Sequence, residues 1–151
     1  MMKWLVTQVN KKNKGFTLIE MVVVLAIIAV LIAIAVPQVL KQINNAKKNA
    51  DIANAKAIAT AIMQWVGEGN SIGANVSNAE VDTTNGTVTL NGQTVDLKKY
   101  MNAGSYKPKY NTEYKFFVDY TLSDDKLVVK AGKDGGSAKE LYPNPDSTYG
   151  Q

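Results

Sequence analysis

A long apolar segment near the amino terminus restricts what this chain can fold into more than any other feature. Of the 25 residues from 16 to 40 all but four are apolar, and Met21–Val36 contains sixteen residues without a polar side chain. The four exceptions are Thr17, Glu20, Pro37 and Gln38. A helix of 25 residues extends roughly 37 Å, more than the roughly 30 Å of a bilayer's hydrocarbon core. We therefore predict that residues 16–40 form a helix that spans a membrane or packs against copies of itself.

Basic residues before this segment predict its orientation. Lys3, Lys11, Lys12 and Lys14 precede it without one acidic residue, and positively charged flanks stay in the cytoplasm. The residues after Leu40 should then lie outside. A conventional secretory signal peptide fits less well, because no small-x-small cleavage site follows the apolar run, which passes directly into a helical pattern.

Composition argues against an enzyme. All 17 basic residues are lysine, and the chain contains no histidine or cysteine. A histidine base, a thiol nucleophile, a Cys/His zinc site and an arginine finger are thereby excluded. A serine or lysine enzyme and an all-carboxylate metal site stay open, but we expect a non-enzymatic protein without a metal or other cofactor. Asp124, Asp125 and Asp134 lack the ligand spacing of a calcium loop, so we interpret them as solvated loop residues.

The net charge of +4 resides in the first fifteen residues. Four lysines lie there, and the remaining thirteen equal the thirteen acidic residues in number. The basic balance therefore indicates membrane topology. Nucleic acid is not an expected partner, although lysines and tyrosines are interspersed between residues 98 and 115.

A second helical pattern continues from residue 41 to residue 66, a stretch without glycine or proline. Its apolar residues define one broad stripe, with polar residues, Asp51 among them, mostly opposite. The stripe comprises Ile43, Ala46, Ala50, Ile52, Ala53, Ala55, Ala57, Ala59, Ala61, Ile62, Trp65 and Val66. We expect a single helix of about 50 residues, ended by Gly67 and the glycines after it, whose second half covers a sheet.

A hairpin is predicted after a polar loop over residues 67–85. Its strands flank Asn91-Gly92, the strongest short hairpin signal. A two-residue turn places Val88 opposite Val95, so turn and apolar face agree on one register.

A second hairpin joins residues 114–122 to residues 127–131. Centring its turn on the two aspartates between these strands predicts Tyr120 opposite Val129. Antiparallel sheet and carboxyl-terminal loops thus occupy residues 86–151. The fold class is α+β, with a long amino-terminal helix packed on a small antiparallel sheet.

The boundary between the basic leader and the apolar segment carries the most specific motif. The run Lys14-Gly15-Phe16-Thr17-Leu18-Ile19-Glu20, followed by the apolar residues, resembles a type IV pilin or a closely related pseudopilin. The resemblance implies that prepilin peptidase removes residues 1–15 by cutting between Gly15 and Phe16. It also implies methylation of the Phe16 amine and roles in filament assembly for Phe16, Glu20 and Pro37. The missing disulfide loop suggests a Gram-positive host.

The position of Glu20 inside the apolar segment carries a free-energy cost in a membrane. A carboxylate within a membrane helix costs about 2.5–3.5 kcal/mol, and no lysine lies between Phe16 and Lys41 to neutralise it. Cleavage before Phe16 creates an amine four residues away, and the amine of a neighbouring subunit could meet Glu20 if the helices are offset by roughly 6 Å. Otherwise Glu20 is protonated or reaches toward the membrane interface.

Pro37 removes one hydrogen bond and costs about 3 kcal/mol in a helix interior. Two interpretations stay open. The resemblance implies local loss of helix on filament assembly, although Ala29 stands where many pilins carry glycine. The other interpretation is a simple bend that fits the helix around the sheet.

The resemblance predicts a structural subunit, the major pilin of a type IV pilus. The prepilin would be a single-pass plasma-membrane protein with its globular head, residues 41–151, outside, and would polymerise into an extracellular filament for adhesion and twitching motility. Its partners would be copies of itself, prepilin peptidase, and the assembly platform with its ATPase. Alternatives are a pseudopilin of a type II secretion or competence system and a membrane-anchored binding module that never polymerises.

Overall fold

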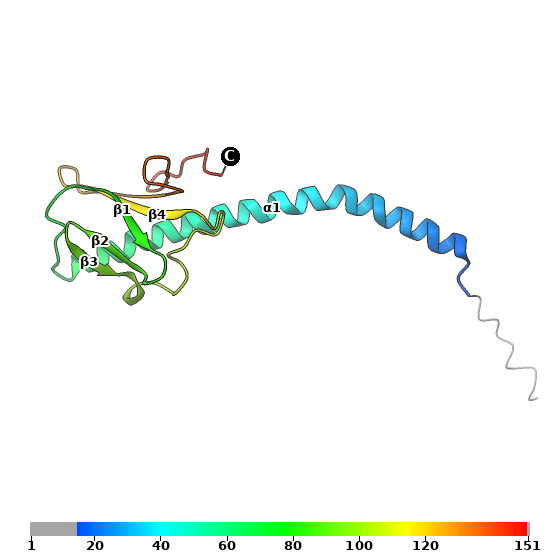
Figure 1. Ribbon diagram of the computed structural model, residues 1–151, viewed down its shortest axis with the longest axis horizontal. Coiled ribbons are helices and arrows are strands. Elements are labelled where there is room, and N and C mark those ends of the chain that lie inside the picture. The colour runs from blue at the N-terminus through cyan, green and yellow to red at the C-terminus, as the bar shows by residue number, and fades with distance from the viewer. Residues whose placement is uncertain (1–14, 151) are drawn as a thin grey trace, which may run out of the picture. The chain divides into compact units, whose positions relative to one another are not determined.

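The computed structural model describes residues 15–150, so the predictions for the lysines up to Lys14 lie outside the described residues. One long helix, α1 (Leu18–Gly67), and a six-stranded antiparallel sheet confirm the predicted α+β fold (Figure 1). The chain divides into two compact units, one ending at Lys41 and one beginning at Gln42, and α1 contributes residues to both. The second unit is termed the head below.

The helix α1 has 50 residues, as the continuous helical pattern predicted. After its end, Gly69 adopts a left-handed backbone with φ of 98°, which residues with a side chain seldom take. The Gly69 amide donates to the carbonyl of Val66 (3.0 Å), and Asn70 Nδ2 donates to the carbonyl of Trp65 (2.8 Å). Carbonyls of the last turn therefore have donors, and the helix stops at Gly67.

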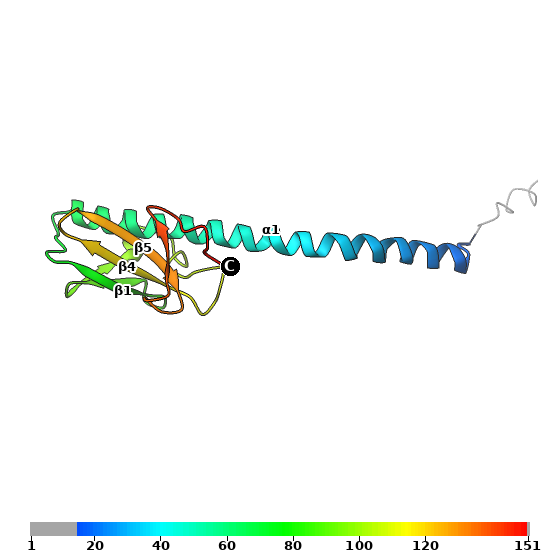
Figure 2. The ribbon, with the colours of Figure 1, turned by 90° about the horizontal axis from the view of Figure 1, so that it is seen from above.

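The sheet has the strand order β3-β2-β1-β4-β5-β6, and every neighbouring pair is antiparallel. Val88 pairs with Val95 across β2 and β3, which confirms the register of the first hairpin. Figure 2 shows β1, β4 and β5 beside the second half of α1. The elements of the head after α1 are β1 (Val76–Asp82), β2 (Thr87–Leu90), β3 (Gln93–Asp96), the 3-10 helix η1 (Leu97–Lys99), β4 (Lys115–Thr121), β5 (Lys126–Gly132) and β6 (Lys139–Tyr142).

Strands β1 and β6 replace loops that the sequence had predicted. Of the seven residues of β1 only Val81 is buried, and of the four residues of β6 only Leu141. Neither strand has the apolar alternation that reveals a half-buried strand. Nevertheless β1 lies in the middle of the sheet and pairs with both β2 and β4. Backbone pairing with its neighbours, rather than its own side chains, defines this strand.

The predicted register of the second hairpin is wrong. Tyr120 pairs with Leu127 and not with Val129. A four-residue loop closes the hairpin between paired residues 121 and 126. Its first residue, Leu122, donates its amide to Asn75 Oδ1 (2.8 Å) and so leaves the β4–β5 ladder. The shift is two residues, so each side chain keeps its predicted face.

The core of the head lies between α1 and one face of the sheet. Its buried residues include Ala55, Ile58, Ala59, Ile62 and Trp65 of the helix and Val81, Val88, Leu90, Val95, Phe116, Val118 and Val129 of the strands. This buried row is rotated from the predicted stripe, since Ala46 and Ala53 are exposed and Asp51 is fully buried. Alanines occur on several sides of this helix, so the apolar pattern did not define its buried face sharply.

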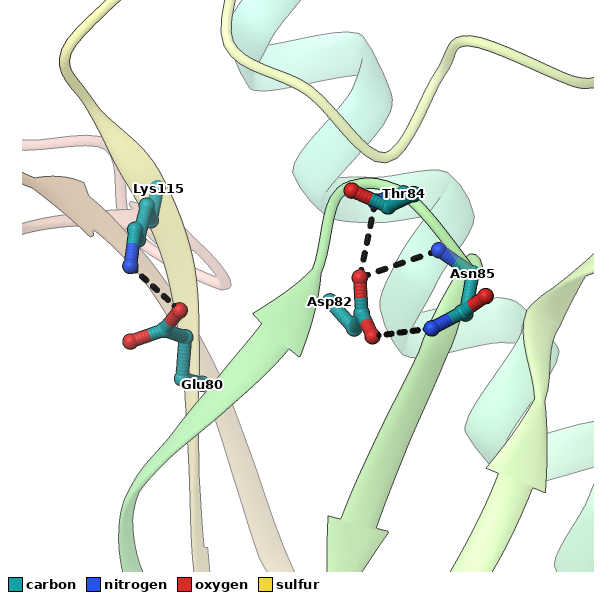
Figure 3. Close-up of polar contacts among 5 residues, drawn as sticks. All are labelled: Glu80, Asp82, Thr84, Asn85 and Lys115. Atoms are coloured by element: carbon teal, nitrogen blue, oxygen red, sulfur yellow. Dashed lines mark hydrogen bonds and ion pairs between the residues drawn. The ribbon is translucent and has the colours of Figure 1, made fainter.

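The turn between β1 and β2 is held by one carboxylate (Figure 3). Asp82 accepts the backbone amides of Thr84 (2.8 Å) and Asn85 (2.9 Å), and its second oxygen accepts the Asn85 side-chain amide (2.7 Å). These bonds hold the pKa of the Asp82 carboxyl below its usual value, and the bonds from Asn85 have the largest effect. Between β1 and β4, Glu80 and Lys115 form an exposed ion pair at 2.5 Å.

Candidate functional site

The predicted cleavage position is accessible. Gly15 is exposed, and a side chain built there would meet no atom within 4 Å. Phe16 is 75% exposed, and the helix begins only at Leu18. The bond between Gly15 and Phe16 is therefore uncovered, non-helical backbone, which is the form that proteases attack most readily.

Glu20 and Thr17 close the start of α1 as a capping box. Thr17 Oγ1 accepts the amide of Glu20 (3.3 Å), while Glu20 Oε2 accepts the Thr17 amide (2.7 Å) and hydroxyl (2.8 Å). These bonds satisfy amide donors that every helix start leaves unpaired. The carboxylate also lies at the positive end of the helix dipole. Within a single chain Glu20 thus has partners already, and an amine from another subunit would join or displace them.

The first part of α1 presents an apolar surface. By length and composition it can cross a membrane, and an apolar stretch of 18 residues in it has no residue buried within the protein. Two shallow apolar hollows lie along it, each lined by side chains one turn apart. Their linings are Phe16, Ile19, Glu20, Val23 and Val24 in one case and Val23, Ala26, Ile27, Val30 and Leu31 in the other. Lipid chains or a similar helix fit such a surface.

Pro37 lies inside the uninterrupted helix α1. Proline has no amide hydrogen, so the carbonyl of Ala33 lacks its helical donor. Seventeen positions separate Pro37 from Glu20, about 25 Å along a helix, so the structure does not bring these two predicted residues together. Gly15, Phe16 and Glu20, in contrast, lie together at the helix start.

A second site, which the sequence prediction missed, is the buried carboxylate of Asp51 in the head. It accepts the backbone amides of Lys109 (2.5 Å) and Tyr110 (2.9 Å) and the hydroxyl of Tyr149 (2.6 Å). Burial first, and then the bond to Asp51, raises the pKa of the Tyr149 phenol. Tyr110 also donates its hydroxyl to the carbonyl of Gly150 (2.8 Å). One carboxylate thus ties α1 to the loop before β4 and to the carboxyl-terminal segment.

The aspartates considered for calcium serve separate loops. Asp125 accepts the Tyr120 hydroxyl (2.8 Å), and Asp134 accepts the Ser137 amide (2.8 Å). Asp124 is exposed at the β4–β5 loop. Across residues 15–150 no three acidic side chains gather where they could hold a metal ion.

Comparisons with known proteins point to the same amino-terminal site. Residues 10–36 match the family described as the prokaryotic N-terminal methylation motif. The chain is 35% identical over 92 residues to the prepilin peptidase-dependent protein A of Clostridium perfringens (strain 13 / Type A), which covers 60% of this chain and 65% of that protein. It is 41% identical over 63 residues to the type IV major pilin protein PilA of Myxococcus xanthus (strain DK1622). This match covers 42% of this chain and 29% of that protein.

The chain spans less than two thirds of the length of both relatives. No solved structure matches it. The methylation motif lies at the amino terminus, and the long helix with its antiparallel sheet gives the predicted α+β architecture. The amino-terminal motif and these two relatives make the chain similar to type IV pilins and pseudopilins.

Proposed function

We propose that this chain is the major subunit of a type IV pilus. It is made as a prepilin whose residues 16–40 span the plasma membrane, with the leader, residues 1–15, in the cytoplasm and the head outside. Prepilin peptidase cuts between Gly15 and Phe16, and the Phe16 amine is methylated. Copies then polymerise, through an assembly platform and its ATPase, into an extracellular filament for adhesion and twitching motility.

Glu20 is the observation that carries this proposal. It is the only acidic residue in the apolar segment, and its side chain is bonded to Thr17 at the helix start. A carboxylate there costs about 2.5–3.5 kcal/mol in a bilayer, more than the roughly 1 kcal/mol that a helix cap contributes, so capping alone does not explain it. A subunit that packs against further copies has a further reason to keep this carboxylate. The amine created on Phe16 of a neighbour, offset by about one helical turn, pairs with the carboxylate and sets the register.

The apolar surface of α1 supports the same role. Burying a Val, Leu or Ile side chain fully contributes about 1.5–3 kcal/mol, so a segment composed of them is stable in lipid or in a helix bundle but not in water. Transfer from the membrane to the filament core keeps these side chains away from water throughout. Loosening of the helix near Pro37, where one hydrogen bond is already missing, would let the segment adapt to that core.

Filaments sheared from cells test the proposal. Glu20→Ala should insert and be cut like the wild type but yield few filaments by electron microscopy, since the register pair is lost. Glu113→Ala is the matched control, because this carboxylate is exposed in the head, 3.4 Å from Lys133, and its filaments should be normal. Wild-type filament yield from Glu20→Ala would contradict the pairing.

A pseudopilin of a type II secretion or competence system is the second candidate. The motif match that favours it is confined to residues 10–36, a segment that pilins and pseudopilins have in common, and leaves the head unassigned. Electron microscopy separates the two. Long surface fibres containing this chain support the pilus, whereas normal processing without fibres, together with a defect in secretion or DNA uptake, supports the pseudopilin.

A further inference from the structure

Three polar side chains meet on the face of the sheet that points away from α1. Asn78 of β1, Asp119 of β4 and Lys130 of β5 come from three adjacent strands (Figure 2). Lys130 Nζ lies 2.6 Å from Asp119 Oδ2 and 2.7 Å from Asn78 Oδ1. The other Asp119 oxygen accepts the backbone amide of Asn78 (2.6 Å). The Lys130 amine thus contacts both the Asn78 carboxamide and the Asp119 carboxylate, and that carboxylate also holds the Asn78 backbone.

This cluster is partly shielded from water. The Lys130 and Asp119 side chains are 17% and 27% exposed. Phe117, which pairs directly with Lys130 across β4 and β5, is only 5% exposed although it is not part of the core against α1. Asn78 is the most open of the three, but Gly135 lies against it, so closely that a side chain there would come within 2.6 Å of Asn78 Cγ. The loop after β5 therefore contacts the cluster at Asn78.

We propose that Lys130 and Asn78 are joined by an intramolecular isopeptide bond, with Asp119 as the acid and base of the reaction. Transfer of a proton from the Lys130 ammonium to Asp119 gives a free amine. The amine attacks Asn78 Cγ while Asp119 protonates the carbonyl oxygen, and the resulting tetrahedral carbon then loses its original nitrogen. That nitrogen takes up protons from Nζ and from the former carbonyl oxygen and leaves as ammonium, so Asp119 ends as a carboxylate.

The geometry gives each residue a distinct part in this step. The contact with Asn78 Oδ1 places the nucleophile beside the carbon that it attacks, which supplies the proximity that the uncatalysed reaction lacks. The hydrogen bond from the Asn78 amide to Asp119 holds Asn78 in a left-handed backbone conformation, with φ of 54°, at the bulge in β1. The product links β1 to β5 across β4, in a chain that contains no cysteine for a disulfide.

Peptide mapping of the purified full chain tests this bond. After denaturation and trypsin digestion, mass spectrometry should find a branched peptide that contains Asn78 and Lys130 and weighs one ammonia less than its two parts. Trypsin should fail to cut after Lys130. Linear peptides ending at Lys130, without the branched species, would overturn the proposal on the wild-type protein alone.

Two variants locate the chemistry. Lys130→Arg keeps a cation beside Asp119 but has no amine that forms a stable amide, so the branched peptide should disappear completely. Asp119→Asn should leave most molecules unlinked, because the proton carrier is lost. Lys115→Arg, in the exposed pair with Glu80, is the matched control and should keep the link. A branched peptide containing Asn78 that persists in Lys130→Arg would place the link at another lysine and overturn the assignment.

Discussion

Replacing Asp51 with alanine should strongly destabilise the head. The amides of Lys109 and Tyr110 and the hydroxyl of Tyr149 would all lose their acceptor. A hydrogen bond to a charged group contributes about 1.5–3 kcal/mol, and a buried donor without a partner costs about 1–3 kcal/mol. Lys109 is exposed and Tyr110 half-buried, so water replaces part of the loss. We expect the free energy of unfolding to fall by about 3–5 kcal/mol, a large part of a domain's stability.

Urea unfolding of residues 16–151 in detergent micelles measures this change. Trp65 is then the only tryptophan of the chain and lies in the core of the head, so its fluorescence reports unfolding there. With a slope of about 2 kcal/mol per molar urea, a loss of about 4 kcal/mol lowers the midpoint by about 2 M. A midpoint within about 0.5 M of the wild type would refute the view that Asp51 holds the three segments together.

Two variants check the reasoning. Tyr149→Phe removes one of the three donors and leaves Asp51 with two, so we expect a smaller loss of about 1–3 kcal/mol. Asp124→Asn removes an exposed carboxylate from the β4–β5 loop and should change stability by no more than about 0.5 kcal/mol. Equal losses from Tyr149→Phe and Asp51→Ala would place the whole effect in the tyrosine contact.

Further predictions concern two glycines and the turn held by Asp82. Gly132→Ala should cost about 1–3 kcal/mol by urea unfolding, because the new carbon would lie 2.5 Å from Ala138 Cα, whereas Gly67→Ala meets no atom within 4 Å and should be neutral. The pKa of Asp82 is lowered in the fold, so its contribution is present above the unfolded value of 3.8 and is lost as the pH falls through the folded value. The urea midpoint should therefore fall less between pH 7 and pH 3 in Asp82→Asn than in the wild type; identical pH profiles would contradict this.

Local patterns made much of the fold predictable. The long run without a helix breaker predicted α1, and Asn91-Gly92 predicted the register of the first hairpin. Because Leu122 is apolar, the sequence pattern placed it in a strand, which shifted the predicted register of the second hairpin. In the structure Leu122 lies in the loop. Strand β1 was missed because Val81 is its only buried residue, and its place in the sheet depends on partners distant in sequence.

The two candidate sites also differ in how far the sequence could predict them. The residues from Gly15 to Glu20 are consecutive, so their motif could be read directly from the sequence. The i, i+3 spacing of Thr17 and Glu20 also signals a capping box, which the prediction overlooked in favour of an intersubunit role for Glu20. Asp51 could not be recognised, because its partners lie 58 to 98 residues away and only the folded head brings them to it.

Mass spectrometry of the amino terminus tests the central claim most directly. Protein from purified surface filaments should begin at Phe16 and carry one methyl group on its amine, since both changes require cleavage after Gly15. Filaments whose subunits still begin at Met1, or carry an unmodified amine at another residue, would contradict processing as a type IV prepilin.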